Sequence, residues 1–144
     1  VFIILYLIML MVYASGSKRA FSEVEKAVSS VLNSDELTKM DERMLKKNFG
    51  LNSADYQGVM YYASPSSVSA AEVLLIQVKN ESQTDAVTDA IEKRKAQRME
   101  DFDGYLPEEV KLLEDAQLSV RGKYIFYAVS SDASKYRNTF DKSL

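Results

Sequence analysis

Predicted strands come in adjacent pairs, and this order constrains the fold more than any other feature of the sequence. Residues 56–63 and 71–78 are rich in aromatic and β-branched side chains and flank a Ser-Pro-Ser-Ser turn. A second pair, 118–121 and 124–130, is separated by Gly122-Lys123, a short connection typical of a hairpin. Adjacent strands of this kind pair in antiparallel fashion, because a parallel pair needs a long crossover between them.

Helical patterns fill the rest of the sequence after the first twenty residues. Apolar residues recur at three- and four-residue spacing over 21–32, where Ser22 and Glu25 form a capping-box pattern. Further helices are predicted from Ser34 to Gly50, from Ser82, as its N-terminal cap, to about Phe102, from Pro107, and from Asp132 towards the C-terminus. This order predicts an α+β fold in which an antiparallel four-stranded sheet of two hairpins packs against helices. In the second hairpin, alternation predicts Leu118 and Val120 inward, and Ser119 and Arg121 outward.

The N-terminal residues 1–14 carry no charged side chain, and this run ends at Ser15-Gly16-Ser17-Lys18-Arg19. A helix of this length spans about 21 Å, short of the roughly 30 Å of a bilayer core. Because the sequence begins at Val1, we expect more apolar residues upstream and interpret residues 1–17 as a truncated signal anchor. Its hydrophobic helix would project from a single α+β extracytoplasmic domain, residues 18–144. A cleaved signal peptide and a buried core helix are the alternatives.

The sequence contains neither Cys nor His. This excludes thiolate nucleophiles, imidazole bases, and zinc sites built on nitrogen or sulfur. The net charge of −3 offers no large positive field for nucleic acid. We therefore expect no cofactor, no metal, no catalytic residue and no nucleic-acid partner.

Carboxylates are concentrated just before the second predicted hairpin. They are Glu100, Asp101, Asp103, Glu108, Glu109, Glu114 and Asp115. Two such groups could act as acid and base in glycoside hydrolysis, or several could bind calcium. Against this, many of them lie at predicted helix ends and none has EF-hand spacing, so solvated, helix-capping charge is the favoured interpretation.

Four residues are the candidates for ligand contact: Tyr62, Tyr105, Tyr124 and Arg98. Exposed tyrosine rings stack on sugars and peptides, although packing in the sheet explains most tyrosines in strands. Tyr105 follows Gly104 in a loop, where it either fastens the loop over the core, the favoured interpretation, or contacts a ligand. Arg98 closes a basic run that begins at Lys93, which is either a handle for anionic polymers and lipid headgroups or a solvated helix face.

Two stretches, YYASPSSVSAAEVLLIQVK and QRMEDFDGYLPEEVKLLEDAQLSVRGKYIFYAVSSDA, resemble a bacterial family known as domain of unknown function 4358. The most recognisable positions are Gln97, Phe102, Tyr105, Pro107, Leu113, Glu114, Gly122 and Tyr124. The resemblance covers residues 23 to 142 and implies an anchored extracytoplasmic domain of Gram-positive bacteria, with no catalytic residues to carry over. Many relatives look like lipoproteins, but this chain lacks the lipid-bearing Cys, so we expect a transmembrane anchor instead.

The leading hypothesis is a membrane-anchored, non-catalytic binding or interaction module of the cell envelope. It would be a single-pass protein of the cell membrane that contacts an envelope protein, peptide or polymer. The alternative is a carboxylate-based hydrolase of envelope glycans. A cleft that holds two of Asp101, Asp103, Glu108 and Glu114 would favour the hydrolase, whereas scattered exposed carboxylates would favour binding.

Overall fold

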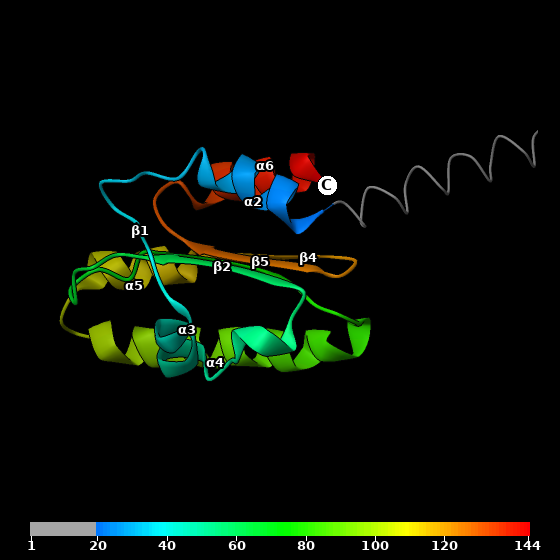
Figure 1. Ribbon diagram of the computed structural model, residues 1–144. Helices are drawn as coiled ribbons and strands as arrows, with labels where there is room; N and C mark the ends of the chain where they lie inside the picture. The colour runs from blue at the N-terminus through cyan, green and yellow to red at the C-terminus, as the bar shows by residue number, and fades with distance from the viewer. Residues whose placement is uncertain (1–19) are drawn as a thin grey trace, which may run out of the picture.

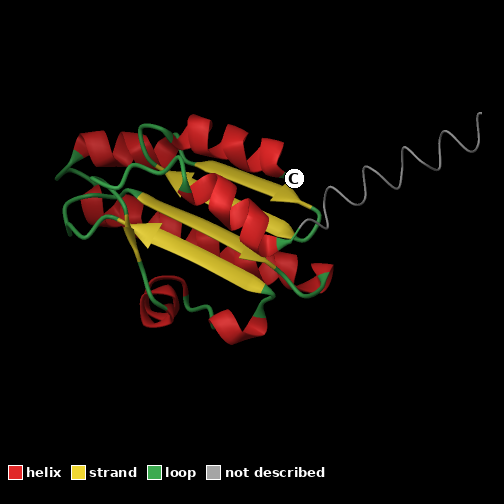
Figure 2. Ribbon diagram, turned by 45° about the horizontal axis from the view of Figure 1, so that its top comes forward, coloured by secondary structure: helices red, strands yellow, loops and turns green. Residues whose placement is uncertain are grey.

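The computed structural model describes residues 20–144, which form an α+β fold of three layers (Figures 1 and 2). A five-stranded sheet lies between α2 and α6 on one face and α3, α4 and α5 on the other. The helices are α2 (Phe21–Ser29), α3 (Glu42–Phe49), α4 (Thr84–Phe102), α5 (Pro107–Glu114) and α6 (Ala133–Ser143). Short 3-10 turns, η1 (Ser53–Asp55) and η2 (Glu81–Gln83), flank the first hairpin.

All neighbouring strands in the sheet are antiparallel, in the order β1-β2-β3-β5-β4. The strands are β1 (Thr38–Lys39), β2 (Gly58–Ala63), β3 (Glu72–Gln77), β4 (Gln117–Arg121) and β5 (Tyr124–Val129). The hairpins β2–β3 and β4–β5 are joined through β3 and β5, which pair with each other. The predicted α+β class and both antiparallel hairpins are therefore confirmed.

The predicted number of four strands is wrong, because β1 adds a fifth. The helix expected from Ser34 begins only at Glu42, where the Asp41 carboxylate accepts a hydrogen bond from the Met44 amide at 3.1 Å. Before it, the chain runs extended along the edge of β2, and the Met40 amide donates to the Tyr61 carbonyl at 2.8 Å. Pairing with β2 overrides the helical pattern in this segment. The predicted end at Gly50 is confirmed, since this glycine has a φ of 70°.

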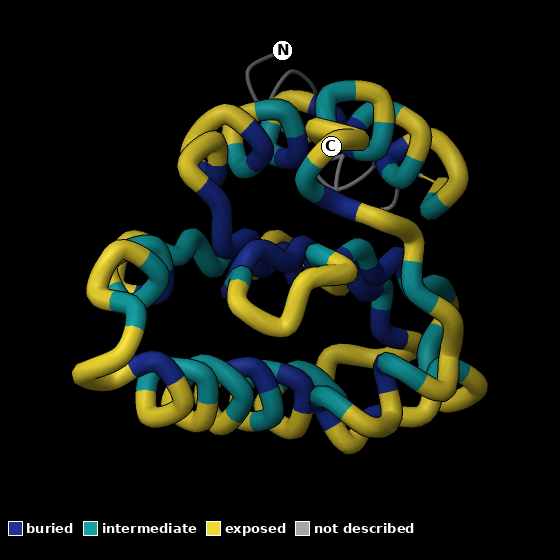
Figure 3. Tube along the Cα trace, turned by 90° about the vertical axis from the view of Figure 1, so that its left-hand side faces the viewer, coloured by how far each residue is buried: buried dark blue, intermediate teal, exposed yellow. Residues whose placement is uncertain are grey.

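Both faces of β3 and β5 are buried (Figure 3). Side chains at alternate positions enter two separate cores. On the α2–α6 face these are Val73, Leu75, Tyr124, Phe126 and Ala128. On the α3–α4–α5 face they are Leu74, Ile76, Ile125, Tyr127 and Val129. The continuous apolar runs of β3 and β5 are the sequence signature of strands covered on both sides.

The predicted side-chain directions in β4 are partly wrong. Gly122, with a φ of 60°, lies in the expected two-residue turn, and Arg121 is exposed as predicted. However, Ser119 is buried while Val120 is 44% exposed. Helix α6 covers the Ser119 side of this edge strand and supplies a partner, since the Ser119 Oγ donates to the Asp141 carboxylate at 3.1 Å. A polar residue can therefore be buried there, and Val120 is left on the open side of the sheet edge.

Two predicted helix caps are also wrong. Helix α2 begins at Phe21 after Ala20, so Ser22 lies within its first turn and caps nothing. The Phe21 ring packs against Gly58, where a Cβ would collide with it, and this contact fixes the start of the helix. Before α4 the capping box is formed by Asn80 and Gln83 of the η2 turn, in place of Ser82.

The membrane segment predicted for residues 1–17 lies outside the described residues, as does its projecting helix over residues 1–14. Within residues 20–144, no helix combines the length and the apolar character that crossing a membrane requires. The anchor therefore stays a prediction.

Candidate functional site

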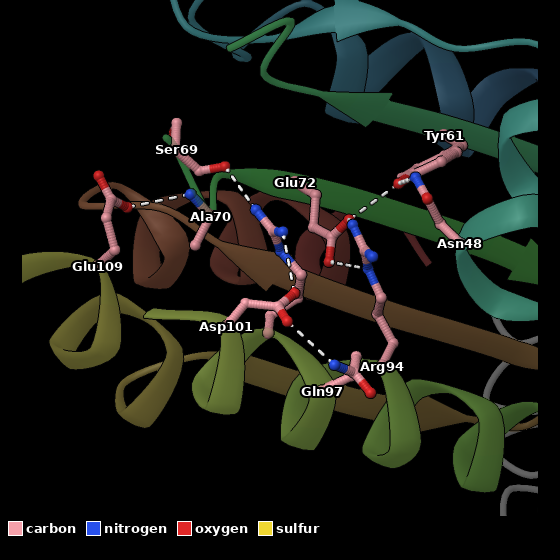
Figure 4. A network of polar contacts seen from close by, with 10 residues as sticks. Asn48, Tyr61, Ser69, Ala70, Glu72, Arg94, Gln97, Asp101 and Glu109 are labelled. Carbon is pink, nitrogen blue, oxygen red and sulfur yellow. Dashed lines mark hydrogen bonds and ion pairs between the residues drawn. The ribbon is translucent and has the colours of Figure 1, made fainter. Parts of the chain in front are cut away.

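The carboxylate of Glu72, at the first position of β3, is almost completely buried under α4 (Figure 4). It accepts hydrogen bonds from the Tyr61 hydroxyl at 2.9 Å and from Arg94 Nε and Nη2 at 3.2 and 3.3 Å. The Tyr61 hydroxyl in turn accepts a hydrogen bond from Asn48 Nδ2 at 2.8 Å. A buried charge is tolerated only when it is paired and hydrogen-bonded, and these four residues meet that condition as one connected set, the Glu72 network.

Four elements, two strands and two helices, bring the Glu72 network together. Tyr61 and Glu72 lie on the same face of the β2–β3 hairpin, because Tyr61 pairs with Leu74 and Ala63 with Glu72. Helix α3 contributes Asn48 and helix α4 contributes Arg94. The network therefore ties both helices to the sheet.

An aromatic ring holds the Arg94 guanidinium from a second direction. Its central carbon lies 5.8 Å from the centroid of the Phe49 ring, a cation–π contact. Phe49 itself meets Tyr61 and Tyr127 edge to face, with centroid distances of 5.3 and 6.5 Å. The position of Arg94 is thus fixed by a carboxylate and by a packed aromatic ring.

Electrostatics keep the Tyr61 phenol protonated and the Arg94 guanidinium charged. Burial raises the pKa of Tyr61, and the nearby Glu72 charge raises it further, so the phenol remains a donor. Burial alone would lower the pKa of Arg94, but the Glu72 carboxylate outweighs this and the pKa is raised. Burial likewise raises the pKa of Tyr127, whose hydroxyl finds no hydrogen-bond partner within residues 20–144.

Beside the Glu72 network, helices α3 and α4 enclose a hollow of about 320 Å³. Its lining includes Lys47, Asn48, Phe49, Lys93, Arg94 and Gln97. Three of these side chains are cationic, and none of the described residues that line the α3–α4 hollow is acidic. A hollow with this lining attracts anions.

The four residues predicted from the sequence do not form one site. Tyr124 is fully buried in the α2–α6 core, so it cannot be part of a ligand-binding surface. Tyr62 is half-buried against the same core. Tyr105 lies in the loop between α4 and α5 and is 67% exposed, so it does not fasten that loop over the core. Arg98 belongs to the opposite face of the sheet from Tyr62 and Tyr124.

Arg98 is largely occupied by structural contacts. Its Nη2 donates to the Ser69 carbonyl at 3.1 Å, and its Nη1 lies 3.4 Å from the Asp101 carboxylate. Its guanidinium also covers the Phe102 ring at 4.5 Å from the centroid. Arg98 therefore fastens the loop between β2 and β3 to α4, and the arginine that lines the α3–α4 hollow is Arg94, one turn earlier.

The acidic patch does not converge on one cleft. Asp101 pairs with Arg98, and Glu109 accepts a hydrogen bond from the Ala70 amide at 3.0 Å (Figure 4). Asp103, Glu108 and Glu114 are exposed. Of these acids, Glu114 and Asp115 line a second hollow of about 530 Å³ between α5 and the start of α6. Within residues 20–144 no cluster of carboxylates is suited to hold a metal ion.

Fold and site together define a small α+β domain with a cationic hollow on one face. The chain matches the family model "Domain of unknown function (DUF4358)" over residues 29–130, and it belongs to that family. The resemblance carried by residues 61–79 and 97–133 is thereby confirmed. No curated protein and no solved structure matches the chain.

Proposed function

We propose that this chain is a non-catalytic binding domain of the bacterial cell envelope. In this proposal residues 1–17 hold it in the cell membrane, and the folded domain faces the extracytoplasmic side. The α3–α4 hollow is the observation that carries the proposal. Its lining offers cations, amides and an aromatic ring, which suit the binding of an anion, and none of its described residues carries a carboxylate, a hydroxyl or a thiol.

Residue chemistry supports binding over catalysis. The sequence has no Cys and no His, which leaves carboxylates as the obvious general acids and bases. Of the four acids named for the hydrolase, Glu114 lines the hollow of about 530 Å³ between α5 and the start of α6. The other carboxylate in that lining belongs to Asp115, which forms an ion pair with Lys111 at 3.3 Å. This larger hollow is the one observation that favours the alternative, a hydrolase of envelope glycans.

Purified envelope fractions separate the two functions. The full 144-residue chain in detergent is mixed with peptidoglycan fragments and with wall polymers, and both binding and release of reducing sugar are measured. We expect saturable binding without sugar release. Sugar release that disappears in Glu114→Gln would establish the hydrolase. If the chain binds none of the envelope fractions, the proposed function is contradicted.

The proposed location is tested on intact cells. A C-terminal epitope tag should be removed by protease added outside intact cells after the outer wall is loosened, while a cytoplasmic marker survives. A tag that becomes accessible only after cell lysis would contradict the extracytoplasmic orientation.

A further inference from the structure

We infer that the α3–α4 hollow binds a phosphate group, carried either by a lipid headgroup or by a soluble phosphate ester. This inference rests on the proposed function, because it names the ligand class of the same site. It follows from the convergence of two basic runs, from the chemistry of the cations and from the summed charge of the lining residues.

Two basic runs that are distant in sequence meet at the α3–α4 hollow. Lys46-Lys47 lies in the last turn of α3, and Lys93-Arg94-Lys95 lies in the middle of α4. The two helices pack against each other on the same face of the sheet (Figure 1). Lys47, Lys93 and Arg94 then line a single cavity, although the whole chain carries a net charge of −3. A concave positive surface on an acidic protein concentrates the field at one place.

The chemistry of the cations favours phosphate over carboxylate. Arg94 already donates to Glu72 through Nε and Nη2, so one of the two edges through which a guanidinium makes paired hydrogen bonds is occupied by the protein itself. The remaining charge comes from lysine ammonium groups, which act as point charges with three donors each. Point charges attract a doubly charged phosphate more strongly than a singly charged carboxylate.

The summed charge of the lining residues remains positive after Glu72 and the end of α3 are included. Glu72 contributes one negative charge beneath the hollow, and the C-terminal end of α3 contributes about −0.5. Set against Lys47, Lys93 and Arg94, these leave roughly +1.5 at the hollow. The Arg94 guanidinium is also held in place by Glu72 and Phe49. Less conformational entropy is lost when a ligand binds to groups that are already ordered.

The test uses a pair of variants with the same change in net charge. Lys47→Gln/Lys93→Gln removes the two lysines of the hollow. The control, Lys26→Gln/Lys135→Gln, removes two exposed lysines from α2 and α6 on the opposite face. Binding of glycerol 3-phosphate, of inorganic phosphate and of acetate to the full chain in detergent is measured by calorimetry. Folding of each variant is checked by circular dichroism.

We expect glycerol 3-phosphate to bind more tightly than acetate and binding to weaken as salt is added. The hollow variant should bind it roughly tenfold more weakly, because two exposed charge contacts are lost. The control variant should bind like the unaltered chain. Equal losses in the two variants would overturn the inference, because they would show that net charge alone attracts the ligand. Equal binding of acetate and phosphate would overturn it as well.

A further comparison identifies the source of the phosphate. Dihexanoyl phosphatidylglycerol, compared with dihexanoyl phosphatidylcholine, tests the lipid headgroup, and glycerol 3-phosphate tests the soluble ester. Binding that is confined to one of them, and that the hollow variant loses, assigns that source. If neither binds while envelope fractions still do, the phosphate inference is wrong and the proposed binding function stands. If envelope fractions do not bind either, the proposed function fails with it.

Discussion

Arg94 on α4 donates two hydrogen bonds to Glu72 at the start of β3, from Nε to Oε2 at 3.2 Å and from Nη2 to Oε1 at 3.3 Å. Around this ion pair the sheet face is lined by apolar side chains such as Leu74 and Tyr127. Removing both charges from water costs several kcal/mol, which complete hydrogen bonding offsets in part. The pair therefore acts chiefly to orient Arg94 beside the α3–α4 hollow.

Breaking this pair from one side should destabilise the fold strongly. Glu72→Met leaves the Arg94 guanidinium without its counter-ion and should cost on the order of 3–5 kcal/mol. The double variant Glu72→Met/Arg94→Met leaves no charge behind and should cost less than the sum of the two single changes, by more than about 1 kcal/mol. Urea denaturation measures all three free energies of unfolding. Strictly additive costs would contradict this account of the pair.

Strand β4 provides a direct test of its corrected orientation. Ser119→Val removes the hydrogen bond to Asp141 in a buried position and should cost about 1 kcal/mol. Val120→Ser, at a position that is 44% exposed, should change the free energy of unfolding by less than about 0.5 kcal/mol. Thermal melts of the two variants show which one loses more stability. A larger loss of stability in Val120→Ser than in Ser119→Val would support the side-chain directions predicted from the sequence.

Tyr105→Ala should leave the fold intact, because the ring is 67% exposed and fills no cavity. The change in the free energy of unfolding should stay within about 0.5 kcal/mol. Phe102→Ala, at the buried end of α4, is the matched aromatic control and should cost on the order of 3–5 kcal/mol. A large drop in melting temperature for Tyr105→Ala would return this residue to the loop-fastening role expected from the sequence.

Strong local signals made most of the fold predictable. The apolar runs of β3 and β5 predict buried strands, while Gly50 and Pro107 predict a helix end and a helix start. Strand β1 could not be recognised because two residues are too few for any periodicity, and it is extended because the edge of β2 offers a partner. The orientation of β4 depended on where α6 covers the sheet, which local alternation does not encode.

The candidate site was only partly visible in the sequence. A signal was present, since Glu72 is a lone carboxylate at the head of an apolar strand and needs a buried partner. Its partner could not be chosen by pattern, because Arg94 and Arg98 are one helical turn apart on the same helix. Asn48 and Lys47 come from α3, and their place beside α4 follows only from the packing of the two helices.

A last prediction concerns Glu36, whose carboxylate lies beside the start of α6 and accepts a hydrogen bond from Ser130 Oγ at 3.2 Å. Burial raises the pKa of Glu36, and the negative charges of Asp132 and Glu109 also raise it, while the Ser130 hydrogen bond lowers it. Because the pKa is higher in the folded state, the folded state binds the proton more tightly than the unfolded state. The stabilisation that results is present in acid and is lost as the pH rises through the folded-state pKa.

Glu36→Gln removes this titration and keeps an oxygen that can accept from Ser130. The variant should therefore gain stability relative to the unaltered chain at neutral pH, and the gain should disappear below about pH 4, where the carboxyl is protonated. Ser130→Ala should act in the opposite sense and lose more stability at neutral pH than in acid, because the hydrogen bond that favours the charged carboxylate is gone. Denaturation curves at the two pH values measure both effects. If Glu36→Gln instead lowers stability at neutral pH and not in acid, the charge contributes to folding through the Ser130 hydrogen bond, and burial is not the dominant influence on this carboxylate.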